Sequence, residues 1–152
     1  MSQADVVGPV DASPGYVLKQ AATALRTAMD AVLRPLQLTV PQYSCLELLG
    51  QQPGLSGSDL ARGTFVTRQS MNLLLQGLQQ RGLLTRPAVA DHGKALPTQL
   101  TAAGRTQLHA ASVAVRAVER QMFAPLSESG RRRLLADLNR CAAAVAQPVS
   151  SD

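Results

Sequence analysis

The sequence predicts a mainly α-helical fold that carries one small β-hairpin. Apolar residues recur at three- and four-residue steps towards both ends of the chain, which is typical of long amphipathic helices. Between them, residues 55–101 hold two short helical patterns, the run Arg81-Gly82-Leu83-Leu84, and two short apolar runs joined by a glycine-containing loop. This order of elements is that of a winged helix-turn-helix. We therefore expect such a head, flanked by a helical dimerisation stalk.

Composition indicates a soluble protein of one domain. Of the 152 residues, 45% are hydrophobic, and no apolar run approaches the ~20 residues that span a membrane. The first 14 residues include no Lys or Arg and no apolar centre, so they do not resemble a signal peptide and we expect a cytoplasmic protein without a membrane partner. The expected parts are a flexible N-terminal arm (1–14), a single domain (15–146) with a head (about 38–101) and a helical dimerisation region (about 15–37 and 102–146), and a tail (147–152).

Two helices are expected before the helix-turn-helix. The first should run from Tyr16 to Arg34, because Pro35 ends or bends it. Its apolar face comprises Leu18, Ala21, Leu25, Ala28 and Val32. Pro41 suits the first turn of the second helix. The residues of that helix expected to face inward are Tyr43, Cys45, Leu46 and Leu49.

Capping residues mark the two helices of the helix-turn-helix. Ser56 and Asp59 have the spacing of a capping box, which predicts a helix from Gly57 to Arg62 that buries Leu60 and Ala61. After a turn at 63–66, Thr67 can cap the next helix. Its packing side comprises Met71, Leu74, Leu75 and Leu78, and its outward side Gln69, Ser70, Asn72, Leu73, Gln76 and Gln80.

A wing and two more helices complete the prediction. Strands are expected at 83–86 and 96–100, with a polar loop between them. Thr101 can cap a long helix that ends before Pro125, and Ser127 can open a last helix. The apolar seams of these helices are Leu108, Ala111, Val115, Val118 and Met122 in the first, and Leu134, Leu138, Cys141 and Val145 in the second.

Positive charge concentrates in the head and at the start of the long helix that follows it. Residues 62–105 hold six basic side chains against Asp91 alone, so their balance of +5 equals the net charge of the whole chain. A basic surface of this kind favours a polyanion such as duplex DNA.

The second helix of the helix-turn-helix carries the candidate base contacts. Gln and Asn side chains can pair bidentately with adenine, and an apolar side chain can touch a thymine methyl group. Charges at helix ends and wing edges can contact phosphate on either side. The candidate DNA-binding residues are Arg62, Thr67, Arg68, Gln69, Ser70, Asn72, Leu73, Arg86, His92 and Lys94.

Catalytic and metal-binding chemistry is not indicated. Cys45 and Cys141 lie far apart on apolar faces, where cysteine packs as a small hydrophobe, so we expect core packing rather than a redox switch. The two histidines, His92 and His109, have no ligand cluster around them in the sequence. No nucleophile motif or phosphate loop is present. We expect neither an enzyme, nor a metal, nor a cofactor.

Four motifs, in this order, resemble the multiple antibiotic resistance regulator (MarR) family of bacterial transcription factors. They are Leu38-Thr39-Val40-Pro41-Gln42-Tyr43 followed by Leu46, Ser58-Asp59-Leu60-Ala61, the stretch from Leu78 through Arg86, and Leu100-Thr101-Ala102-Ala103-Gly104-Arg105. The resemblance spans about residues 16–145. It implies a homodimer that binds a pseudo-palindromic operator, usually as a repressor, and releases it when a small amphipathic or phenolic compound binds between stalk and head. Tyr16 and Met29 are our candidate ligand contacts.

Two positions depart from the family pattern. The wing has His92-Gly93-Lys94 where relatives commonly carry Asp-x-Arg, and Lys94 cannot supply a bidentate fork. Leu73 stands where relatives often carry Arg. This shortage of arginine keeps an alternative open, namely a winged-helix protein-interaction module that does not read DNA specifically.

Overall fold

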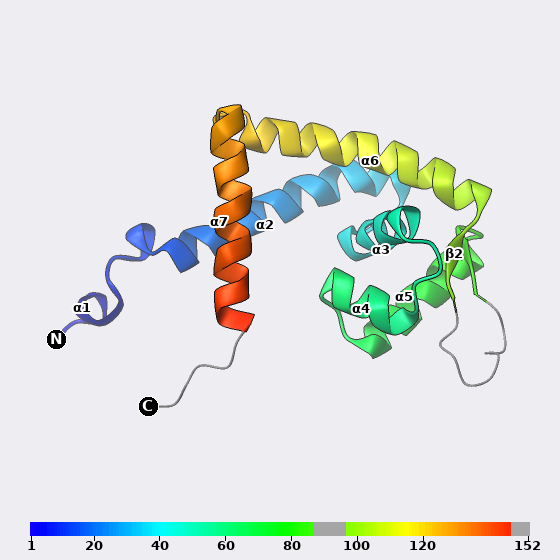
Figure 1. Ribbon diagram of the computed structural model, residues 1–152, viewed down its shortest axis with the longest axis horizontal. Coiled ribbons are helices and arrows are strands. Elements are labelled where there is room, and N and C mark those ends of the chain that lie inside the picture. The colour runs from blue at the N-terminus through cyan, green and yellow to red at the C-terminus, as the bar shows by residue number, and fades with distance from the viewer. Residues whose placement is uncertain (87–96, 147–152) are drawn as a thin grey trace. The chain divides into compact units, whose positions relative to one another are not determined.

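The computed structural model describes residues 1–86 and 97–146. Their helices and strands follow the expected order (Figure 1). The elements are α1 (Gln3–Val7), η1 (Val10–Ala12), α2 (Pro14–Leu33), η2 (Arg34–Leu36), α3 (Val40–Gln51), α4 (Gly57–Thr64), α5 (Arg68–Gln80), β1 (Leu84–Thr85), β2 (Gln99–Leu100), α6 (Ala102–Phe123) and α7 (Glu128–Ala146). Within the described residues, no helix is both long and apolar enough to cross a membrane. The fold is a winged helix-turn-helix with added helices, as predicted.

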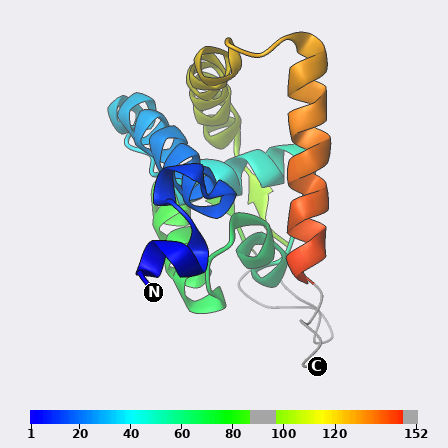
Figure 2. The same cartoon turned by 90° about the vertical axis from the view of Figure 1, so that its left-hand side faces the viewer.

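The chain divides into two compact units, Met1–Val118 and Glu119–Asp152. At its start, residues 3–7 and 10–12 form separate helical turns ahead of α2, and these turns bury no residue (Figure 2).

Side-chain caps set the helix starts. The reciprocal hydrogen bonds of Ser56 and Asp59 open α4, and the Thr67 hydroxyl accepts the Ser70 amide at 3.1 Å at the start of α5. Both caps confirm the predictions. α4 runs to Thr64, two residues further than expected. A second capping box at the start of α3, formed by Thr39 and Gln42, was missed although its Thr-x-x-Gln spacing is visible in the sequence.

The core of the head lies between α3, α4 and α5, which pack against one another (Figure 1). The fully buried side chains include Leu46, Leu49, Leu60, Met71, Leu75 and Leu78. All six were expected to face inward. Leu33 and Leu38 join this core from the end of α2 and the segment after it.

Within the described residues, the strands of the wing are shorter than predicted. β1 pairs antiparallel with β2 over two residues each, with Leu84 opposite Leu100 and Thr85 opposite Gln99. Thr98 pairs instead with the loop after α3, since its amide donates to the Leu55 carbonyl at 3.1 Å and its carbonyl accepts from Gly54 at 3.0 Å. Backbone groups of successive strand residues face opposite sides, so Thr98 pairs with this loop while its neighbour Gln99 pairs with Thr85 of β1.

The start of α6 is locked onto the exit of α5. The Thr101 hydroxyl donates to the Gly82 carbonyl at 2.6 Å and accepts the Gly104 amide at 3.0 Å. A Cβ atom added to Gly104 would lie 1.9 Å from the Leu83 carbonyl oxygen, so only glycine allows this close approach. The base of the wing is therefore fixed to the first turn of α6.

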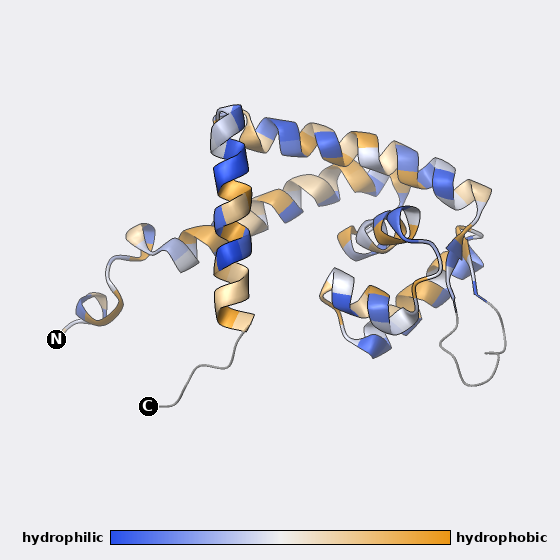
Figure 3. Ribbon diagram, in the orientation of Figure 1, coloured by the Kyte–Doolittle hydropathy of each residue, from blue (hydrophilic) through white to orange (hydrophobic). Residues whose placement is uncertain are grey.

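Two expected apolar faces are only partly buried among the described residues. Leu18 on α2 is 50% exposed, whereas Ala21, Leu25, Ala28 and Val32 are half-buried. In the Glu119–Asp152 unit, α7 buries no residue and apolar and polar residues alternate along it (Figure 3). The expectation that Cys141 packs in a core was wrong, because its side chain is exposed. In this unit α7 lies against the end of α6, and a single neighbouring helix cannot cover the whole apolar side of α7.

Candidate nucleic-acid interface

The N-terminus of α5 is held by its own cap. The Thr67 hydroxyl, besides accepting the Ser70 amide, lies 2.9 Å from the Ser70 hydroxyl. This arrangement satisfies one of the free amides of the first turn and leaves the partial positive charge of the helix end next to Arg68. A negatively charged partner is favoured at that end.

The outward side of α5 is polar and accessible. Arg68, Gln69, Ser70 and Asn72 are exposed, and Leu73 is 65% exposed. Met71, Leu75 and Leu78 hold the opposite side in the core. The structure thus confirms the predicted division of α5 into a packing side and an outward side. The Asn72 Oδ1 atom lies 3.6 Å from the position of a Cβ atom on Gly57, so Asn72 borders the start of α4.

Three of the basic side chains near the head contact the protein itself. Arg62 pairs with Asp59, one helical turn away. Hydrogen bonds from the hydroxyl and backbone amide of Ser56, together with the Arg62 charge, hold the pKa of Asp59 below its ordinary value. Arg81 donates to the Gln37 carbonyl at 2.7 Å, and Arg105 donates to the Leu100 carbonyl at 3.3 Å. Arg68 is exposed at the start of α5, and Arg86 is half-buried after β1.

The Arg81 contact was missed by sequence reasoning, which used this residue as a positive charge and as part of the motif from Leu78 through Arg86. The Leu36 carbonyl accepts a hydrogen bond from Gln107 of α6 at 2.6 Å, and the next carbonyl, that of Gln37, accepts from Arg81 at the end of α5. Gln37 has a positive φ of 56°, which turns the chain out of η2. These two hydrogen bonds therefore connect both the end of α5 and α6 to the turn at residues 36 and 37.

The wing residues His92 and Lys94 lie outside the described residues.

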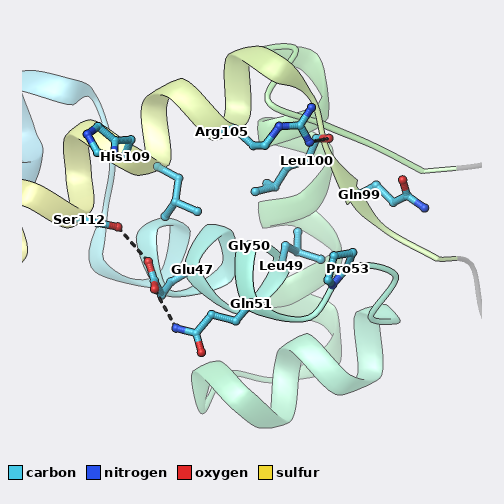
Figure 4. A pocket seen from close by; sticks show the side chains of 11 residues that line it. Glu47, Leu49, Gly50, Gln51, Pro53, Gln99, Leu100, Arg105, His109 and Ser112 are labelled. Carbon is cyan, nitrogen blue, oxygen red and sulfur yellow. Dashed lines mark hydrogen bonds between the residues drawn. The ribbon is translucent and has the colours of Figure 1, made fainter.

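A cavity of about 430 Å³ lies between α3, β2 and α6 (Figure 4). Its apolar side includes Leu49, Leu100 and Leu108, and α6 adds Arg105 and His109. On the α3 side, the Glu47 carboxylate accepts from Gln51 at 2.8 Å and from Ser112 at 2.9 Å. A pocket of this size with an apolar wall and a guanidinium suits a small molecule that carries an acidic group.

Sequence reasoning did not identify this cavity. Tyr16 is 49% exposed near the start of α2, Met29 packs against the core, and neither residue lines the cavity. The available signal was the four-residue spacing of Arg105 and His109 with Leu108 between them, which gathers these side chains on one part of α6.

Cys45 does not belong to any accessible site. Its side chain is fully buried, and burial raises the pKa of the thiol to about 12. The thiol stays neutral near physiological pH, which fits the expected core packing.

Comparison with known proteins places this geometry in a family. Residues 36–95 match the sequence model of the MarR family. The HTH-type transcriptional repressor Rv2887 of Mycobacterium tuberculosis is 42% identical over 122 residues, which are 80% of this chain and 88% of that repressor. A structure of Rv2887 in complex with DNA superposes with a TM-score of 0.71 at 37% identity, covering 86% of this chain and 98% of the other.

A structure of Rv2887 in complex with salicylic acid gives a TM-score of 0.69 at 39% identity, covering 86% of this chain and 96% of the other. The chain belongs to the MarR family of winged helix-turn-helix transcriptional regulators.

Proposed function

We propose that this regulator is a homodimeric repressor that binds a pseudo-palindromic operator through α5 and is released by a small acidic ligand. The observation that carries the proposal is the exposed polar side of α5, held by a capped N-terminus against a fully packed opposite side. A rigid helix that presents Gln and Asn side chains is what major-groove recognition requires.

The outward residues of α5 have distinct proposed roles. Gln69 and Asn72 are exposed amides suited to adenine, and Leu73 offers an apolar contact to a thymine methyl group. Arg68, together with Thr67 and Ser70, lies where the helix end would approach phosphate. The proposed DNA contacts also include Arg62, Arg86 and, outside the described residues, His92 and Lys94.

Two copies of the head are needed to bind two half-sites. The partly exposed apolar stripes of α2 and α7 are the surfaces that a second copy would cover. Since each α5 would occupy one major groove, the half-sites would lie about one helical turn apart, roughly 34 Å.

The cavity beside β2 offers a route for release. A ligand carboxylate would pair with Arg105, which now donates to the Leu100 carbonyl, while an aromatic ring would lie on Leu100 and Leu108. Because β2 leads out of the wing, a ligand that displaces this contact would favour a wing position that does not fit the operator. That Rv2887 has been solved with salicylic acid supports this ligand class.

The proposed activity consists of binding alone. It requires no covalent chemistry, so we propose that the chain is not an enzyme. We also propose that it acts in the cytoplasm, where a bacterial regulator of this kind meets the chromosome.

The test is binding of the purified protein to the DNA flanking its own gene, beside a scrambled duplex, at two salt concentrations. The account predicts tighter binding to the native duplex that persists at the higher salt. Equal, salt-sensitive binding to both duplexes would mean that the head binds DNA only as a nonspecific basic surface. No binding to either duplex would favour a protein-interaction module.

The ligand part has its own test, with salicylate as the probe. Salicylate should release the wild-type protein from DNA, and Arg105→Gln should require about tenfold more salicylate because the guanidinium is lost. Arg116→Gln, an exposed arginine further along α6, is the matched control and should respond as wild type does. Equal responses of the two variants would remove Arg105 from the ligand site.

A further inference from the structure

Phe65 combines two features that the fold does not need. It ends α4 with a left-handed conformation, φ 61° and ψ 37°, and its side chain is 94% exposed. Bulky side chains disfavour this region of the backbone, where glycine and asparagine are most at ease. Phe65 gains no burial in return. Neither the turn nor the core of the head accounts for a phenylalanine here.

The position of Phe65 adjoins the proposed DNA-binding surface. It lies two residues before Thr67, the cap of α5, and between Arg62 and Arg68, which are both exposed. From Leu60 to Gln80 the sequence contains no acidic residue, and Asp59, just before this stretch, pairs with Arg62. An exposed aromatic ring beside basic side chains suits a partner that has negative charge at its edges and apolar surface next to that charge.

Duplex DNA has that chemistry. Phosphates border the grooves, and deoxyribose rings and thymine methyl groups present apolar surface beside them. A helix end that carries Arg68 towards phosphate would carry the preceding turn along the same edge of the groove.

We infer that Phe65 packs on deoxyribose and thymine methyl groups at the edge of the groove that α5 enters. This contact rests on the proposed function, because it requires α5 to dock on duplex DNA. The left-handed turn leaves the ring 94% exposed, so it can meet DNA without a change in the backbone. Phe65 therefore adds apolar affinity next to a recognition helix with one arginine, and it adds no charge.

Substitutions at position 65 separate the ring from the turn. Phe65→Gly and Phe65→Asn suit the left-handed backbone but remove the apolar ring, whereas Phe65→Leu keeps apolar bulk in the same strained conformation. The probe is the tightest duplex enriched from a randomised DNA pool by the wild-type full-length protein. We expect about tenfold weaker binding for the Gly and Asn variants, an intermediate value for Leu, and unchanged or higher melting temperatures for Gly and Asn.

Salt dependence distinguishes the ring from a charge. An apolar contact releases no counterion, so the slope of log Kd against log salt should stay at the wild-type value in Phe65→Gly. Arg68→Ala, the matched control next to it, should lower that slope by about 0.9. A changed slope in Phe65→Gly would contradict the inference.

The possible outcomes are separable. If the wild-type protein enriches no duplex, the proposed function fails. If it does enrich one and Phe65→Gly binds that duplex as tightly as wild type, only the inference about Phe65 fails. A large loss of melting temperature in Phe65→Gly would assign the ring to folding and would also overturn the inference. A photoreactive phenylalanine analogue at position 65 should crosslink to the duplex, and crosslinking to protein alone would contradict the inference.

Discussion

The helices α5 and α7 are both amphipathic, but among the described residues α5 buries its apolar side and α7 buries no residue. Met71, Leu75 and Leu78 of α5 are fully buried against α3 and α4. On α7, Leu138 is 40% exposed and Leu135 is 65% exposed. The difference teaches that periodicity identifies the apolar side of a helix without identifying what covers it. For α5 the cover is the rest of the head, and for α7 we propose a second copy of the chain.

The largest expected effect comes from truncating the covered helix. Leu75→Ala should destabilise the protein by about 2–5 kcal/mol, because it opens a cavity in a fully packed core. Leu138→Ala removes the same atoms from α7 and should change the stability of the head by less than about 0.5 kcal/mol. Urea unfolding followed by circular dichroism measures both. Sedimentation velocity should show weakened self-association only in Leu138→Ala, and equal effects of the two variants on unfolding would break the comparison.

The next effect concerns two glycines on helices. Gly104→Ala should cost about 1–3 kcal/mol or more, because the new Cβ atom would meet the Leu83 carbonyl oxygen at 1.9 Å. Gly77→Ala within α5 is the matched control, since its Cβ atom would meet nothing within 4 Å. It should stabilise the helix by about 0.5–1 kcal/mol. Thermal melting distinguishes these opposite signs, and a loss in both variants would contradict the close approach of α6 to the wing.

A smaller effect concerns the cap of α4. Ser56→Ala should cost about 1 kcal/mol, because it removes the hydroxyl that accepts the Asp59 amide. The pKa of Asp59 is lower in the folded protein than its ordinary value of 3.8, so its contribution is present above that pH and is lost as the pH falls through the folded value. Chemical denaturation between pH 3 and pH 6 should therefore show a weaker pH dependence in Ser56→Ala. An unchanged dependence would mean that Ser56 does not shift Asp59.

The smallest effect leaves the sequence intact and compares the two thiols. At pH 8, iodoacetamide should label Cys141 in the monomeric protein, where that side chain is exposed, and leave Cys45 unlabelled because that thiol is buried and neutral. Mass spectrometry of peptides from native and denatured protein measures both sites. Labelling of native Cys45 at the rate of Cys141 would show that the core of the head opens readily.

Much of the head follows from local sequence signals. Ser56, Thr67 and Thr101 mark helix starts because their side chains satisfy amides that the helix itself leaves free. The burial of Leu60, Met71 and Leu75 follows from spacing on a helix of 3.6 residues per turn. These features depend on neighbours a few positions away, so a single sequence reveals them.

The missed features depend on contacts that are distant in the sequence. Thr98 pairs with the loop at Leu55, on the side of the strand that faces away from β1. Arg81 donates to the Gln37 carbonyl, 44 positions away. A residue that the sequence presents as a positive charge therefore connects the end of α5 to the turn after η2. The cavity brings Glu47 and Arg105 together from different helices. No local pattern specifies such pairs, and the exposed, left-handed Phe65 also became visible only in the structure.

The central claim is that the outward side of α5 reads sequence while the surrounding charges supply affinity. Its most direct measurement is the base preference of wild type, Asn72→Ala and Lys94→Ala, each determined with the same randomised duplex pool at one salt concentration. The account predicts that Asn72→Ala loses discrimination of about 1–3 kcal/mol at one or two positions, whereas Lys94→Ala weakens all duplexes alike. Unchanged preference and affinity in both variants would contradict the placement of α5 in the groove.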